Sequence, residues 1–200
     1  MKKKSVWSLN LSTAAIALVP TAIGINYLGK LFAGILKLPV WLDSIGTVLA
    51  SMLAGPIIGA LSGIINNIIF GITADPISTV YAITSGAIGL SVGYMSYKGW
   101  LKNMKTVVLM GLIVGFIAAI ISTPLNIIFW GGQTGNVWGD TFYAYLVSNG
   151  FPVWLASFGD SVVVDVPDKI VTVIFSYLIF KGLPNNFISI FRGSEGIEEL

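Results

Sequence analysis

The chain has 200 residues, of which 55% are hydrophobic and 10% are charged, whereas soluble proteins carry about 25% charged residues. This composition excludes an ordinary soluble domain. The sequence contains no Cys or His, which excludes disulfides, thiolate and imidazole catalysis and most zinc and haem sites. At about 20 residues per spanning helix, we predict an all-α polytopic membrane protein with six transmembrane helices in a single domain.

The first predicted helix covers about residues 9–27. It carries three small side chains at four-residue spacing, which give it one smooth face for helix packing: Thr13, Ala17 and Thr21. An MKKK start before an apolar run is also typical of a cleavable signal peptide. The apolar run continues past Pro20 to Tyr27, however, and an even number of helices requires that it be retained.

An external loop is predicted at residues 29–39, and the second and third helices of the chain follow it as a helical hairpin. The second helix, about 40–54, is short for a full crossing and has Trp41 and Asp43 at its start. The third helix, about 56–73, begins at a proline, which suits the first turn of a helix. A stripe of mostly glycine runs down this helix and predicts close contact with a neighbouring backbone: Gly55, Gly59, Gly63, Asn67 and Gly71.

The second half of the chain continues the pattern of apolar helices. The fourth and fifth helices, about 77–97 and 104–130, are followed by a glycine- and aromatic-rich extracellular connection at 131–159 that we expect to act as a lid. Its aromatic residues suit either an interfacial helix or a simple membrane-interface belt. A sixth helix, about 160–180, and an acidic cytoplasmic tail, 183–200, complete the chain.

The sixth helix holds a group of charges in its first half: Asp160, Asp165, Asp168 and Lys169. Charges inside a membrane helix are costly, so they should face protein or a wet cavity. Asp165 and Lys169 are four residues apart and can pair. Pro167 between them, like Pro124 in the fifth helix, predicts a local break that would open a cavity. We expect this group to bind ligand; an ion pair that only fixes helix register is the alternative.

The candidate binding residues are the carboxylates, cation, amides and flat rings of these helices: Asp165, Lys169, Asp168, Asn126, Trp130, Tyr81, Asp43, Trp41 and Asn67. They suit a neutral planar heteroaromatic ligand with hydroxyl or amino substituents. A polyanion would find few external cations. The asparagines also fit a second interpretation, as hydrogen-bonded links between helices. We expect no catalytic residue, no metal and no cofactor.

Basic residues are sorted between the two sides of the predicted bundle. Eight of the eleven fall on the side of the termini: Lys2, Lys3, Lys4, Lys98, Lys102, Lys105, Lys181 and Arg192. Because cytoplasmic loops carry an excess of Lys and Arg, we predict that both termini lie in the cytoplasm and that the protein is a multi-pass protein of the cell membrane.

The stretch LDSIGTVLASMLAGPIIGALSGIINNII, residues 42–69, resembles the second and third helices of S components, the substrate-binding subunits of energy-coupling factor (ECF) vitamin transporters. The likeness is greatest to members for hydroxymethylpyrimidine or pyridoxine-type compounds, and it extends to VDVPDKIVTVIFSYLIFKGLP near the end. The resemblance implies capture of a small vitamin and partnership with a transmembrane coupling subunit and two ATPases. It also implies that Thr13, Ala17 and Thr21 form the docking face.

Two further function classes stay open. The first is an aspartate-dependent intramembrane enzyme, for which the Asp165/Asp168 pair is the only support, since neither a GxGD nor a DGxxAR pattern occurs. The second is a gradient-driven carrier that works alone. A P-loop is not expected, because Leu31 stands where Ser or Thr would bind magnesium after Lys30. No nucleic-acid partner is expected either.

Overall fold

The computed structural model describes residues 12–192, and all regular secondary structure in that part of the chain is helical. The prediction of an all-α protein is confirmed for these residues. The elements are α1 (Thr13–Leu36), α2 (Ile45–Ala54), α3 (Pro56–Thr73), η1 (Pro76–Thr79), α4 (Ala82–Tyr97), η2 (Trp100–Lys102), α5 (Met104–Trp130), α6 (Val137–Ser148), α7 (Val153–Gly182) and α8 (Asn185–Arg192).

Three of the helices, α1, α3 and α5, are long and apolar enough to cross a membrane. This supports a membrane protein, as the composition predicts. Two other helices of the bundle do not meet this combination of length and apolar character, for different reasons. α2 has 10 residues, or about 15 Å of helix, and α7 is long but carries several charges along its 30 residues.

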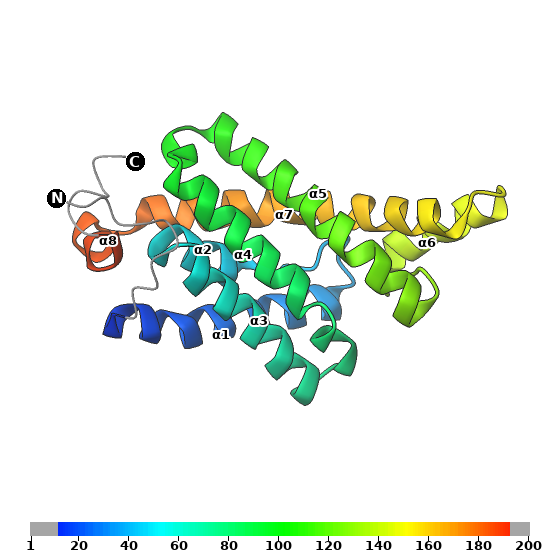
Figure 1. Ribbon diagram of the computed structural model, residues 1–200, viewed down its shortest axis with the longest axis horizontal. Coiled ribbons are helices and arrows are strands. Elements are labelled where there is room, and N and C mark those ends of the chain that lie inside the picture. Colours follow the sequence, from blue (N-terminus) through cyan, green and yellow to red (C-terminus); the bar gives the residue numbers. More distant parts are fainter. Residues whose placement is uncertain (1–11, 193–200) are drawn as a thin grey trace.

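The bundle is elongated, and its two ends differ in content (Figure 1). The start of α1, the turn between α2 and α3, the connection between α4 and α5, and α8 lie together; we call this the terminal end. α6 and the connection between α3 and α4 lie toward the opposite end. Successive connections between the long helices therefore lie at alternate ends of the bundle, as the predicted order of helices requires.

Glycines allow the helices to approach one another closely. A Cβ on Gly93 of α4 would lie 2.3 Å from Pro56 Cα of α3, and a Cβ on Gly115 of α5 would lie 2.7 Å from Val166 Cα of α7. Contacts this short exclude any side chain larger than a hydrogen. Close contact is thus present between α3 and α4, as the glycine stripe of α3 predicts, and also between α5 and α7, where it fixes the position of α7 in the bundle.

The predicted boundaries of the first two helices were wrong. α1 continues to Leu36, so most of the predicted loop 29–39 is helical, while residues 40–44 are not. Gly29 does not end the helix, because its role is packing: a Cβ there would lie 2.2 Å from the backbone oxygen of Leu42. The predicted start at residue 9 and the lysines at 2–4 lie outside the described residues.

The second half also departs from the prediction. α7 begins at Val153, before Asp160, so Asp165 lies about 18 Å along the helix. α5 and α7 continue through Pro124 and Pro167 without a break. α6 lies within the predicted connection 131–159. α7 is longer than predicted because residues 153–159 add about two turns at its start, where Gly159 lies close to Phe142 and Leu146 of α6.

The predicted tail 183–200 contains a helix, α8. Its Ile188 is buried in the core, and the Arg192 guanidinium donates to the backbone oxygen of Met52 in the last turn of α2. Carbonyls at a helix end have no partner within the helix, so Arg192 supplies one. The acidic ending SEGIEEL lies outside the described residues.

Candidate functional site

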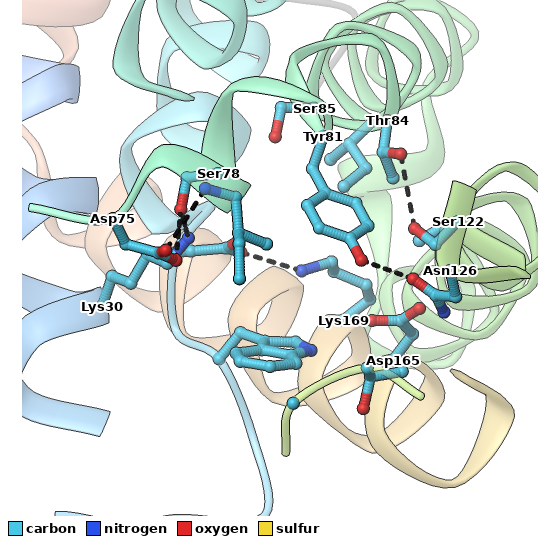
Figure 2. A pocket seen from close by; sticks show the side chains of 17 residues that line it. Lys30, Asp75, Ser78, Tyr81, Thr84, Ser85, Ser122, Asn126, Asp165 and Lys169 are labelled. Atoms are coloured by element: carbon cyan, nitrogen blue, oxygen red, sulfur yellow. Dashed lines mark hydrogen bonds and ion pairs between the residues drawn. The ribbon is translucent and has the colours of Figure 1, made fainter. Parts of the chain in front are cut away.

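A cavity of about 210 Å³ lies inside the bundle (Figure 2). Its walls come from α1, η1, α4, α5 and α7 and from two connections: the 37–44 linker between α1 and α2, and the 131–136 connection between α5 and α6. Segments distant in the sequence therefore meet around one space.

Lys169 is the centre of a buried ion-pair group on the α7 side. Its ammonium lies 3.1 Å from Asp43 Oδ1 and also contacts the carboxylate of Asp168. The other oxygen of Asp168 accepts from the backbone N–H groups of Trp41 and Leu42, at 3.0 and 2.9 Å. Since buried charges persist only when they are paired and hydrogen-bonded, this group fastens the 37–44 linker to α7.

The predicted pairing of Asp165 with Lys169 was wrong, because Lys169 pairs with Asp43 and Asp168 instead. The four-residue spacing permits the pair, but the linker brings a second carboxylate to Lys169 that the spacing along α7 does not reveal. The Asp165 side chain is only 8% exposed and lines the cavity. No described residue donates a hydrogen bond to it.

An aromatic wall faces α7 across the cavity. The Tyr81 hydroxyl donates to Asn126 Oδ1, and Asn126 Nδ2 donates to Ser161 Oγ at 3.0 Å. The indole of Trp130 stacks on the Tyr81 ring, with centroids 5.6 Å apart and planes 19° from parallel. Figure 2 shows Tyr81, Asn126 and Lys169 converging on the same space. The Tyr81 ring is thus held at both its edge and its face.

Polar residues that were not predicted from the sequence also line the cavity, and Lys30, Asp75 and Ser78 form a connected group among them. Lys30 Nζ donates to Ser78 Oγ at 2.6 Å, and Ser78 Oγ donates to Asp75 Oδ2 at 3.2 Å. Lys30 was missed because it was assigned to an external loop. An Asp-Pro pair that caps a short helix was the available signal for Asp75.

The 131–136 connection closes one side of the cavity through Thr134. Its backbone N–H donates to Asp140 and Asp160, at 3.0 and 3.1 Å, and its hydroxyl donates to Asp160 at 2.9 Å. Asn136 Nδ2 donates to the backbone oxygen of Leu38, at 3.2 Å, and so joins the connection to the 37–44 linker. Asp160 therefore supports the wall and does not face the cavity.

Six of the nine candidate binding residues line the cavity: Asp165, Lys169, Asn126, Tyr81, Asp43 and Trp41. The other three lie directly behind the wall. Asp168 is behind Lys169, Trp130 is behind Tyr81, and Asn67 donates to the hydroxyl of Ser85, a lining residue. Thr13, Ala17 and Thr21 lie together on the exposed face of α1, away from the cavity.

The arrangement can hold a small polar molecule by hydrogen bonds, charge and ring contacts. Among residues 12–192, no group of three or more His, Cys, Asp or Glu side chains is placed to bind a metal ion. Comparison of the chain with protein-family models, curated proteins and solved structures found no match.

Proposed function

We propose that this protein is the substrate-binding S component of an ECF-type importer, which captures a small vitamin or precursor of the hydroxymethylpyrimidine or pyridoxine kind. The observation that carries the proposal is the convergence of six candidate residues on one cavity within the bundle. They come from the 37–44 linker, from α5 and α7, and from Tyr81 directly before α4. Polar residues that served only to link helices would not need to line the same cavity.

The size and lining of the cavity support a single-ring ligand. Small-molecule sites commonly measure about 300–1,000 Å³, and this cavity, at about 210 Å³, is smaller. Its rings, Trp41 and Tyr81, suit a flat ligand. The hydroxyls of Thr84 and Ser122, which contact each other at 3.3 Å, and the amide of Asn126 suit hydroxyl or amino substituents.

We propose six membrane crossings in the cell membrane, with both termini in the cytoplasm. In support, the described basic residues other than Lys30, Lys37 and Lys169 lie in the α4–α5 connection, the first turn of α5, the last turn of α7 or α8, all at the terminal end (Figure 1): Lys98, Lys102, Lys105, Lys181 and Arg192. Cytoplasmic ends are enriched in such residues. Single cysteines at Asn103 and Gln133 of this cysteine-free chain should be labelled from the inside and the outside, respectively.

The proposed partners are a transmembrane coupling subunit and two ATPases. The exposed face of α1 supports docking, because Thr13, Ala17 and Thr21 leave it smooth while Ala15, Leu18 and Ala22 pack inward. A paired-aspartate enzyme is less well supported. Asp168 is engaged by Lys169 and two backbone N–H groups, so Asp165 alone of that pair faces the cavity.

Uptake of radiolabelled hydroxymethylpyrimidine and pyridoxine, in cells with and without the coupling subunit and ATPases, tests the proposal. We expect the chain alone to bind one of these compounds and to import it only with the partners present. Import without them would favour the gradient-driven carrier, and chemical conversion of the ligand would favour an enzyme. Binding of neither compound would contradict the proposed substrate class.

A further inference from the structure

The cavity is lined by more carboxylates than ammonium groups. Two ammonium groups line it, those of Lys30 and Lys169, and three carboxylates line it, those of Asp43, Asp75 and Asp165. A fourth carboxylate, Asp168, contacts Lys169 from behind the wall. With all of these groups ionised, the site carries an excess of negative charge.

Four carboxylates against two ammonium groups leave two negative charges in excess, one within the group of Lys169, Asp43 and Asp168 and one at Asp165. Lys169 is shared by Asp43 and Asp168. Asp75 accepts from the Ser78 hydroxyl at 3.2 Å and from the Ile77 backbone N–H at 3.2 Å. Asp165 is the remaining carboxylate, and no described residue donates to it.

Burial makes an ionised Asp165 carboxylate costly in free energy. Asp165 is 8% exposed and lines the cavity. An ionised carboxylate in such surroundings is costly unless it has a cationic or hydrogen-bonding partner. Since the side chain lines the cavity, the ligand is the group in position to provide that partner.

The aromatic side chains of the cavity favour the same kind of ligand. Trp41 and Tyr81 line the space that Asp165 also faces, and Trp130 supports the Tyr81 ring from behind. Aromatic faces attract cations as well as flat rings. Carboxylate and rings together therefore select a flat, positively charged molecule over a neutral one.

We propose that the ligand is a single-ring compound that binds as a monocation, with Asp165 as its counter-ion. The positive charge can be a quaternary ring nitrogen or a protonated ring or amino nitrogen. This inference rests on the proposed function, because it assumes that the cavity captures a small ligand. It replaces the neutral ligand expected from the sequence.

Two probes of the same shape test the charge. The 1-methyl-3-(hydroxymethyl)pyridinium ion is permanently cationic, and 3-methylbenzyl alcohol is its neutral counterpart. Calorimetric titration of the purified protein should give tighter binding of the cation, by about tenfold or more, the scale measured for close charge pairs in interfaces. Asp165→Asn keeps the side-chain volume and should reduce this ratio to near one.

Asp75→Asn is the matched control, since it removes a lining carboxylate that already accepts hydrogen bonds; it should change the ratio by less than tenfold. Thermal unfolding establishes that each variant is folded, and the wild-type ratio tests the charge even if Asp165→Asn does not fold. A wild-type protein with no preference for the cation, or a folded Asp165→Asn that keeps the preference, would overturn the inference. Binding of hydroxymethylpyrimidine or pyridoxine would leave the proposed function standing in that case.

Discussion

The terminal end of the bundle and the region around the cavity differ in the kind of side chain that they bury. Near the terminal end, apolar side chains such as Met52, Val92, Val107 and Met110 are fully buried, and glycine brings helix backbones into contact. Around the cavity, Lys169 and Asp168 are buried and Asp43 is half-buried in place of apolar groups. The first region gains stability from packing, whereas the second bears the cost of burying charge.

The close-packed region acts as a frame, and the side chains around the cavity are held in place by it. Close-packed helices hold their positions to within small displacements because little free volume remains. Side chains that must meet a ligand need such a frame, since binding depends on their position before the ligand arrives. The glycines near the terminal end belong to this frame, whereas the charges around the cavity join the 37–44 linker to α7 and line the space that we propose binds ligand.

The largest expected effect comes from Lys169→Met. The change leaves the buried Asp168 and the half-buried Asp43 without their cation, and loss of one partner of a buried ion pair costs about 3–5 kcal/mol. Denaturant unfolding in detergent should measure this loss. Adding Asp168→Asn should recover part of the stability, whereas adding Asp165→Asn should recover less. Equal recovery by both would show that the ion-pair group is wrongly assigned.

A smaller effect is expected from Gly93→Ala in the frame. The new Cβ would lie 2.3 Å from Pro56 Cα, so α3 and α4 must separate. Overpacking of this kind costs about 1–3 kcal/mol. Gly24→Ala in α1 is the control, because no atom lies within 4 Å of its Cβ position; it should be neutral or stabilising by about 0.5–1 kcal/mol. Similar results for both variants would refute close helix contact at Gly93.

The smallest effect on stability is expected on the exposed face of α1. Ala17→Trp should change the free energy of unfolding by less than about 0.5 kcal/mol, because Ala17 is exposed. The same change at the buried Ala22 should destabilise the protein. Ala17→Trp should nevertheless weaken assembly with the coupling subunit in pull-down experiments. Full assembly and transport by Ala17→Trp would exclude this face as the docking surface.

Local patterns in the sequence predicted much of the fold. Four-residue glycine spacing identified helix faces that do pack closely, and the α3 and α5 boundaries agree with the predicted ranges. The end of α1 was not predictable in this way. Gly29 and Lys30 read as a loop, because a glycine that admits a distant backbone looks the same as one that ends a helix.

The site was predictable as a set of residue types but not as a set of contacts. Asp165, Asn126 and Tyr81 are polar groups within apolar segments, which indicates a site or a buried contact. The partner of Lys169, by contrast, depends on the path of the 37–44 linker, where Leu42 has a positive φ of 52°. No periodic pattern reports such a path, so Asp43 was proposed as a ligand contact and not as an ion-pair partner.

The central claim is that the cavity captures a small ring compound. Mass spectrometry of small molecules released from the purified protein tests it directly, with Ala118→Leu as the comparison, because Ala118 lines the cavity and its enlargement would fill part of the space. We expect the wild-type protein to release a single-ring compound in near-stoichiometric amount and the folded Ala118→Leu variant to release far less. Equal amounts from both proteins, or no such compound from the wild type under conditions where it is present in the cell, would contradict the claim.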